Sequence, residues 1–287
     1  LTTLMAGAAV AHAAVPHEPA ASEAEGKVTR FALVVGSNAA LTKGQSPLRF
    51  ADDDAARMAE LLRESGSRVE LLTAFDKESQ QLFRGEVSRA KLPTRANVDA
   101  AMKRIASQMK DASKHGRVEF LFYYSGHGDI GGDGRRYLTL AGERLTRHDL
   151  FGTVLAQSSA DANHVVIDAC QSEKFVLARG EWKDDRARKT HTEEVEAYLE
   201  KNQLSNFPNT GVILASSVDQ QTHEWERYRG GIFTHELLSG LRGGADINGD
   251  GRIEYSELGA FISSANRGVD DPRARLELTL LPPSSDQ

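Results

Sequence analysis

Two side chains that can do covalent chemistry stand at the ends of apolar segments. His127 lies in the run YYSGHG (123–128), and Cys170 lies in the run DACQS (168–172). A thiolate is a strong nucleophile, and a neighbouring imidazole can take its proton and later protonate a leaving amine. The glycines on both sides of His127 leave room for a substrate backbone, and a free N–H beside it can stabilise an oxyanion. Together the two residues indicate nucleophilic catalysis by a thiol.

The alternative interpretation of both residues is structural. A lone cysteine is commonly a small buried hydrophobe, and a lone histidine is commonly a structural residue. Here both residues follow apolar segments and lie among glycines and serines, and this context favours the catalytic interpretation.

The composition limits the classes of function. The 287 residues are 40% hydrophobic and 26% charged, which is typical of a globular protein rather than a disordered or fibrous one. The net charge is -6, so we expect no general attraction to nucleic acid or anionic lipid, and no nucleic-acid partner. With Cys170 as its single cysteine, the chain cannot form an intrachain disulfide, a CxxC redox pair or a Cys-rich metal site.

The two ends of the chain have different compositions from the middle. The first 15 residues form an apolar run that closes on a small-x-small pattern, AHA, which is typical of a signal-peptide cleavage site. We predict a signal peptide and a disordered linker over residues 1–27, and hence an exported protein, periplasmic or secreted. The alternative is an Ala-rich tail on a cytoplasmic protein. No other apolar run reaches the roughly 18 residues of a membrane helix, and LLPPSSDQ (280–287) is predicted to be a second tail.

Apolar runs alternate with helical patterns through the middle of the chain. Runs without polar alternation predict buried parallel strands at 31–36, 69–75, 117–126, 164–170 and 210–217. Helical spacing predicts helices at 52–65, from a capping Thr94 to Ala112, from Thr146 onward, and at 231–241. This order favours one α/β domain with a doubly wound, mostly parallel sheet. Functional residues of such sheets lie at the carboxyl ends of the strands, where His127 and Cys170 occur.

These motifs resemble those of a known peptidase family. SGHG (125–128) after an apolar strand, with the cysteine of DACQS (168–172) 43 positions after the histidine, is similar to the caspase-like cysteine peptidases. This clan comprises caspases, metacaspases and their bacterial relatives. The similarity extends over about residues 28–265. Asp168 stands where caspases have the glutamine of Q-A-C, and this D-x-C form resembles metacaspases and bacterial homologues.

The resemblance implies a fold and a mechanism. The implied fold is a caspase-like three-layer α/β/α sandwich over residues 28–280 with a mostly parallel central sheet. The implied activity is that of an endopeptidase with a His/Cys dyad, in which Cys170 is the nucleophile and His127 the general base and acid. The oxyanion hole is placed at the backbone amides of Gly128 and Cys170. The implied partners are protein or peptide substrates, and the oligomeric state stays open.

The resemblance also implies a substrate pocket. Caspases receive an aspartate side chain, whereas metacaspase-like members use acids and select Arg or Lys. An acidic pocket attracts a cationic side chain by charge pairing, so cleavage after Arg or Lys is expected. Of the three acids at 52–54, two are expected only to cap a helix. The residues expected in the pocket are Asp54, Ser125, Asp168, Ser217 and Asp219.

A calcium-binding pattern lies near the end of the similarity. The segment DINGDGRIEYSE (246–257) has oxygen-bearing residues at the spacing of an EF-hand loop, with Gly251 at the position of the sharp turn. We predict an EF-hand-like Ca²⁺ site here, and the alternative is a polar turn that has lost its metal. Bound calcium would either stabilise the fold or gate activity. The expected ligands are Asp246, Asn248, Asp250, the carbonyl group of Arg252, Glu254 and Glu257.

Three further segments are weaker signals. Residues 173–203 are rich in both charges and are either a segment with processing sites or a solvated insertion. GDIGGDG (128–134) lacks the GK[ST] of a phosphate loop and is predicted to be a mobile loop. HEWER (223–227) lacks the second histidine of a zinc helix, so Glu224 and Trp225 are expected to shape a substrate groove.

Two functions of different classes follow from these patterns. The leading hypothesis is an exported cysteine endopeptidase that is modulated by calcium. The second is a calcium-dependent interaction module on a catalytically inactive caspase-like fold. The intact pair of His127 and Cys170 favours the enzyme.

Overall fold

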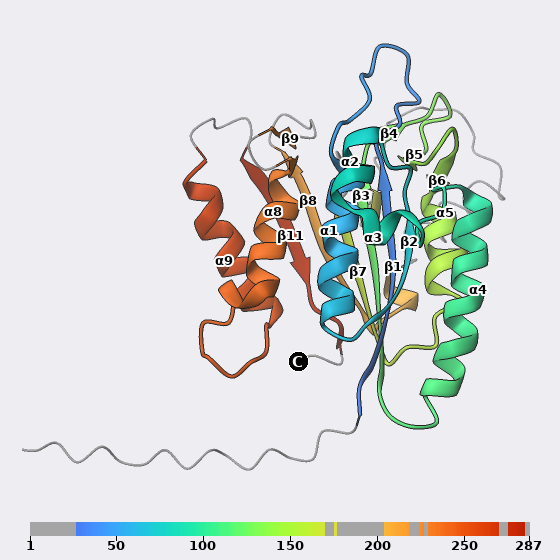
Figure 1. Ribbon diagram of the computed structural model, residues 1–287. Helices are drawn as coiled ribbons and strands as arrows, with labels where there is room; N and C mark the ends of the chain where they lie inside the picture. The colour runs from blue at the N-terminus through green and yellow to red at the C-terminus, as the bar shows by residue number, and fades with distance from the viewer. Residues whose placement is uncertain are drawn as a thin grey trace, which may run out of the picture.

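A six-stranded sheet forms the centre of the molecule (Figure 1). The computed structural model describes residues 27–169, 175–176, 204–217, 224–226, 229–269 and 275–284. The strand order is β11–β8–β7–β3–β1–β2, in which β11 (Leu276–Leu281) is antiparallel to its neighbour and the other pairings are parallel. The parallel strands are β1 (Thr29–Ser37), β2 (Arg68–Leu72), β3 (Val118–Gly126), β7 (Ala162–Asp168) and β8 (Thr210–Ser217).

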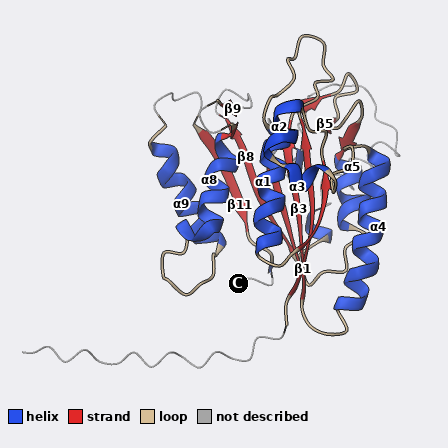
Figure 2. Cartoon of the chain, in the orientation of Figure 1, coloured by secondary structure: helices blue, strands red, loops and turns tan. Residues whose placement is uncertain are grey.

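Helices cover both faces of this sheet, as Figure 2 shows. One face packs against α1 (Ala51–Glu64), α8 (Ile232–Ser239) and α9 (Tyr255–Arg267). The other packs against α4 (Arg95–Ala112) and a π-helical segment (Leu150–Leu155), which continues the single turn of α5 (Arg147–Asp149). The predicted three-layer α/β/α arrangement with a mostly parallel sheet is confirmed. Within the described residues, no helix is long and apolar enough to cross a membrane.

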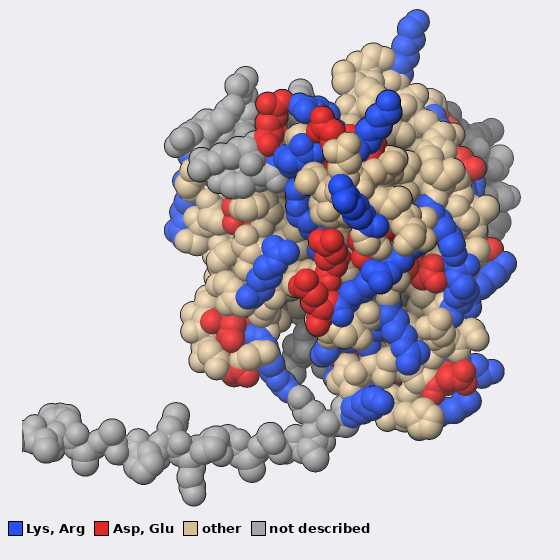
Figure 3. Space-filling view, viewed as in Figure 1, with Lys and Arg blue, Asp and Glu red and all other residues tan. Residues whose placement is uncertain are grey.

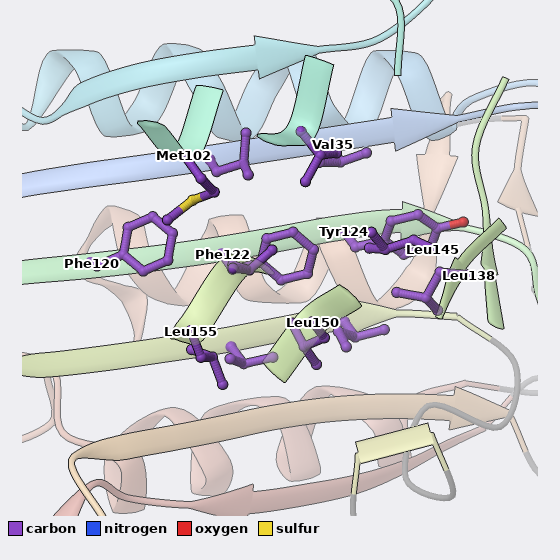
Figure 4. Packing of buried hydrophobic residues seen from close by; sticks show 14 of the residues in the cluster. Val35, Met102, Phe120, Phe122, Tyr124, Leu138, Leu145, Leu150 and Leu155 are labelled. Carbon is purple, nitrogen blue, oxygen red and sulfur yellow. The ribbon is translucent and has the colours of Figure 1, made fainter. Parts of the chain in front are cut away.

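Strand β3 shows how the core divides between the two faces. Successive side chains of a strand point to opposite faces. Phe120, Phe122 and Tyr124 therefore lie together on the α4 face, where Figure 4 shows them beside Met102 and Leu150. Tyr123 points the other way, into the cluster beneath α1 and α8. Both faces of β3 are buried, as its unbroken apolar sequence predicts.

Helix α4 matches its sequence prediction closely. The Thr94 side chain accepts a hydrogen bond from the Asn97 N–H and so caps the first turn. The buried residues of the helix are the predicted apolar stripe, Val98, Ala101, Met102, Ile105 and Met109. A capping residue and a period of 3.6 are local signals, so they need no knowledge of the tertiary fold.

The segment after His127 differs from its prediction. Instead of a mobile loop, it begins with strand β4 (Gly128–Ile130) in a small antiparallel sheet with β5 (Arg136–Thr139) and β6 (Arg144–Thr146). Only the turn between β4 and β5 keeps the glycine-rich character. The sheet is stable because Leu138 and Leu145 are buried in the main core, a contact that a local glycine count does not register.

One helix end and the C-terminal segment also differ. The predicted helix at 231–241 ends at Ser239 and continues as a π-helical turn, Gly240–Gly244. LLPPSSDQ is not a free tail where it is described: Leu280 and Leu281 belong to β11, and the Ser284 N–H donates to the Pro208 carbonyl at 3.0 Å. The criterion of unbroken apolar runs misses this antiparallel edge strand, because β11 (LELTLL) alternates apolar and polar residues over most of its length.

The surface carries interspersed charges of both signs. On the face drawn in Figure 3, Lys and Arg side chains lie among Asp and Glu side chains, without a broad region of one sign. Several of these charges form ion pairs, such as Arg104 with Glu70 at 2.7 Å and Arg229 with Glu78 at 3.0 Å. Exposed pairs of this kind contribute about 0–1 kcal/mol each, so the fold depends on its core instead.

The core packing gives a first prediction. Phe120 is 0% exposed between β3 and α4, and we expect Phe120→Ala to lower the free energy of unfolding by about 3–5 kcal/mol, because it leaves a cavity. The matched control is Leu92→Ala, since Leu92 is 57% exposed and should change stability by less than about 0.5 kcal/mol. Urea denaturation followed by circular dichroism measures both, and equal losses would contradict this account of the core.

Candidate active site

The carboxyl ends of β1, β3 and β7 meet at one edge of the sheet. The register pairs Ser37 of β1 with Gly126 of β3, and Ser125 of β3 with Asp168 of β7. His127 therefore follows directly on one strand, and Asp168 ends the neighbouring strand. Cys170 lies outside the described residues, two positions along the chain after Asp168.

The backbone of His127 is held by a buried tyrosine. The Tyr124 hydroxyl, which has one proton to donate, lies 2.9 Å from the carbonyl oxygens of both His127 and Thr139, and the Thr139 N–H donates to the same His127 carbonyl at 2.9 Å. Gly126 must be a glycine here, because a Cβ atom would lie 2.4 Å from the Tyr124 hydroxyl and 2.9 Å from the Ser37 carbonyl oxygen. The strand end is therefore fixed from several sides.

The imidazole ring of His127 is oriented by a backbone carbonyl. Its Nε2 atom lies 3.0 Å from the Ser46 carbonyl oxygen, which can only accept, so Nε2 carries the proton. The ring is buried, and its Nδ1 atom has no hydrogen-bond partner in the part of the chain that the structure describes. Burial lowers the pKa of His127 below its ordinary value of 6.5, while the Ser46 bond and the Asp129 charge act in the opposite direction. The result is a neutral imidazole with a free lone pair on Nδ1, which is the state of a general base.

Ser46 belongs to a connection that is tied to the same sheet edge. In the β1–α1 connection, residues 38–50, Thr42 contacts both the Asp129 carboxylate and, at 3.2 Å, the Tyr137 hydroxyl. Asp129 and Tyr137 lie on β4 and β5, next to His127. Sequence reasoning did not find Ser46, because its contribution is a carbonyl group that every residue type carries.

Three of the predicted pocket residues lie together. We call Asp54, Ser125, Asp168 and Gly231 the acid pocket. Asp54 Oδ2 accepts from the Gly231 N–H at 2.9 Å and from the Ser125 hydroxyl at 3.4 Å. A Cβ atom at Gly231 would lie 2.8 Å from Asp168 Oδ2 and 3.2 Å from Asp54 Oδ2, so both carboxyl groups flank this glycine. Ser217 ends β8, but its side chain and all of Asp219 lie outside the described residues.

The two carboxyl groups of the acid pocket are buried, and their proton affinities are high. Asp54 is 3% exposed and Asp168 is 7% exposed. Burial, and then the charge of Asp168, raise the pKa of Asp54 well above its ordinary 3.8. Burial raises the pKa of Asp168 to about 6, against hydrogen bonds from Thr234 that lower it. Two buried carboxyl groups this close do not readily ionise together, so the pocket favours a cation that would allow both to carry charge.

Asp52 and Asp53 do not act as simple helix caps. Asp52 accepts from the Asn38 side chain at 2.7 Å, and Asp53 accepts from the Ser79 hydroxyl at 2.5 Å, so each ties α1 to another segment. At the start of α1, the Ala51 N–H donates to Asn38 Oδ1 at 2.8 Å, and the Phe50 N–H, just before the helix, donates to the carboxylate of Glu224 in β9 (Glu224–Trp225) at 2.7 Å. The prediction that two of the acids only cap the helix is wrong, because Asp52 and Asp53 bind other segments and the helix start is bound by Asn38.

Comparisons with known proteins agree with this geometry. The family model described as Caspase domain matches residues 29–270. The chain belongs to the caspase-domain peptidase family. Its members are cysteine peptidases, and the family implies protein substrates.

Two further comparisons, with solved structures and with curated sequences, add little to the family match. Among 104 solved chains that match is the structure of pro-sf-caspase-1, with a TM-score of 0.48 and 13% sequence identity over 94% of each chain. A comparison with curated protein sequences finds no match.

The predicted calcium loop lies within the matched caspase domain. Gly251 has a φ of 79°, the left-handed conformation that the sharp turn of an EF-hand loop requires. Asp246 accepts from the Gly251 N–H at 3.0 Å, and Glu257 accepts from the Asn248 N–H at 3.3 Å. Within the described residues, no three His, Cys, Asp or Glu side chains gather as a metal site. The loop backbone therefore fits a calcium loop, while its carboxylates contact backbone N–H groups rather than converge.

The burial of His127 gives a second prediction. In the Cys170→Ala protein, NMR titration of the His127 ring should give a pKa below 6.5, and Asp129→Asn should lower it further by removing a negative charge. Between the folded pKa and the unfolded value, the unfolded chain binds more protons, so His127 makes the fold less stable as pH falls through that window. His127→Gln assigns the resonance, and a pKa above 6.5 would contradict the proposed ring environment.

Proposed function

We propose that this caspase domain is a cysteine endopeptidase that hydrolyses peptide bonds after Arg or Lys. The observation that carries the proposal is the His127 ring, because its Nε2–H is occupied by the Ser46 carbonyl and its buried Nδ1 is left to accept a proton. Cys170 follows the neighbouring strand, two residues after Asp168, and is the thiol that the family motif supplies.

The proposed reaction proceeds through an acyl-enzyme. Nδ1 of His127 takes the thiol proton of Cys170, and the thiolate attacks the carbonyl carbon of the scissile bond. The N–H groups of Gly128 and Cys170 are the proposed donors to the oxyanion. His127 then protonates the leaving amine and the C–N bond breaks. A water molecule that gives its proton to the same ring adds to the acyl carbon, the C–S bond breaks to release the acid product, and the ring returns the proton to the Cys170 thiolate. No metal or cofactor takes part in these steps.

The acid pocket is the proposed site for the cationic side chain before the cleaved bond. Asp54 and Asp168 converge on Gly231, and Ser125 adds a hydroxyl group to Asp54. A guanidinium or ammonium group placed there pairs with buried carboxylates, where charge pairing is stronger than in water. Arg57 Nη1 lies 3.6 Å from Asp54 Oδ1, so one cation of the chain already pairs with this carboxyl group.

A peptide series tests this proposal. The peptides differ only in the residue before the cleaved bond, which is Arg, Lys, citrulline or Asp. Those with Arg or Lys should be cleaved with a kcat/KM at least about 100-fold higher than those with citrulline or Asp. Cys170→Ala should lower kcat by at least about 1,000-fold, because it removes the nucleophile.

Two outcomes would contradict the proposal. Cleavage only after Asp would exclude the acid pocket as the specificity site. Correctly folded wild-type protein that cleaves no peptide, and is not labelled at Cys170 by an arginyl peptide electrophile, would favour the inactive interaction module.

We also propose that the loop 246–257 binds Ca²⁺. The support is the turn at Gly251 together with oxygen atoms at every ligand position, from Asp246, Asn248, Asp250, the Arg252 carbonyl group, Glu254 and Glu257. Binding requires the carboxylates to leave their backbone N–H partners and turn toward the ion. Hard oxygen ligands of this kind select calcium and would join the π-helical turn after α8 to the start of α9.

Calorimetry and thermal unfolding test the calcium site. Titration with Ca²⁺ should give one binding event and raise Tm, since a ligand that binds only the folded state stabilises it. Asp246→Ala should abolish both effects. Asp111→Ala, which removes an exposed acid at the far end of α4, is the matched control and should keep them. Binding that survives Asp246→Ala would place the calcium elsewhere.

A further inference from the structure

A chain of buried hydroxyl groups lies behind Asp168. The Thr234 hydroxyl donates to Asp168 Oδ2 at 2.7 Å, and the Tyr123 hydroxyl lies 2.6 Å from the same Thr234 oxygen. Both Thr234 and Tyr123 are 0% exposed. When Thr234 gives its one proton to a carboxylate, the Tyr123 hydroxyl must be the donor in the other bond. Burial raises the pKa of Tyr123 well above 10.0, so it keeps that proton.

Thr234 also presents its backbone to Asp168. It stands in the first turn of α8, and its backbone N–H, like its hydroxyl group, lowers the pKa of the Asp168 carboxyl group. Asp168 thus has a short hydroxyl bond, at 2.7 Å, beside a helix N-terminus that favours negative charge. Asp54 accepts weaker hydrogen bonds, from the Gly231 N–H at 2.9 Å and from the Ser125 hydroxyl at 3.4 Å.

This difference divides the two acids of the pocket. We propose that Thr234, supported by Tyr123, is a specificity-determining positioning residue that keeps the Asp168 carboxyl group ionised and directed into the acid pocket. The inference rests on the proposed function, because the cation that meets Asp168 is the Arg or Lys side chain of the substrate. Asp54 then holds the proton that the two acids share, and it releases this proton when the cation binds.

The surroundings of Asp168 set the direction of its pH dependence. The titratable groups that face it are Asp54 of α1, Tyr123 of β3 and Glu224 of β9, while Arg57 of α1 pairs with Asp54 instead. Glu224 and Asp54 oppose its ionisation, and the Thr234 bonds favour it. A cation binds the ionised form, so affinity rises as pH rises through the pKa of Asp168, which is about 6. Removing the Thr234 hydroxyl raises that pKa and moves the rise in affinity to higher pH.

Ligand binding by the Cys170→Ala protein separates this effect from the titration of His127. Calorimetry follows the binding of a short arginine peptide amide, and of its neutral citrulline counterpart, from about pH 5 to pH 8.5, a range that spans the expected titration. Thr234→Val keeps the shape of the side chain but removes the hydroxyl, and should move the midpoint of the affinity curve up by about one pH unit and weaken binding at low pH about tenfold. Thr234→Ser restores the hydroxyl and should follow the wild-type curve. Citrulline should bind weakly, without this midpoint.

The outcomes distinguish the inference from the function on which it rests. If wild type prefers arginine and Thr234→Val keeps the wild-type midpoint, the role of Thr234 is wrong while the proposed function stands. If wild type binds arginine and citrulline equally, the proposed function is wrong. If Thr234→Val does not fold, Tyr123→Phe is the test variant, because it removes only the second hydroxyl group of the chain. A smaller upward shift of the affinity midpoint would support the role of the hydroxyl chain, and an unchanged midpoint would overturn it.

Discussion

The carboxyl groups of Asp54 and Asp168 lie side by side and are shielded from water. Much of the surrounding structure compensates for their burial. A buried carboxylate is unfavourable unless hydrogen bonds or opposite charges compensate for its lost hydration. Asp54 and Asp168 receive such bonds from Gly231 and Thr234, at the point where β10 (Gly230–Gly231) leads into α8. The start of α8 is therefore fixed by the acids as much as by its own apolar face.

The same constraint explains the two glycines before α8. A Cβ atom at Gly230 would lie 2.5 Å from Asp54 Oδ1, and one at Gly231 would lie 2.8 Å from Asp168 Oδ2. Any larger residue would separate the backbone from the acids that it must satisfy. Arg229, immediately before them, adopts a φ of 51°, and its side chain reaches Asp53 at 3.4 Å. The strained backbone is thus held by an ion pair to α1, which keeps the glycines over the pocket.

The sequence was informative where the determining signal was local. The apolar runs gave the five parallel strands, and the rule that functional residues follow parallel strands placed His127 and Asp168 at one edge. Asp54, Ser125 and Asp168 came from motif similarity, and the fold brings them together. The features that the sequence did not predict depend on contacts between residues far apart in the chain. The Ser46 carbonyl has no sequence signal, the β4–β6 sheet is stabilised by the main core, and Asp52 and Asp53 bind segments that no periodicity connects to α1.

The β1–α1 connection joins the two halves of the site mechanically. Its Ser46 carbonyl orients His127, while its Asn38 side chain accepts from the Ala51 N–H at 2.8 Å and so fixes the start of the helix that carries Asp54. Glu224 holds the end of the connection, and Thr42 holds its middle. Because these contacts share one short stretch of chain, a shift of the connection would move His127, the proposed base, and the α1 side of the acid pocket together. Asp168 does not depend on this connection, because it ends β7 and is bound by Thr234 of α8. The distance between the Asp54 and Asp168 carboxyl groups therefore depends on how α1 packs beside α8. The position of the His127 ring and the shape of the acid pocket are therefore set by one packing arrangement, and a change in the β1–α1 connection that alters one of them alters the other.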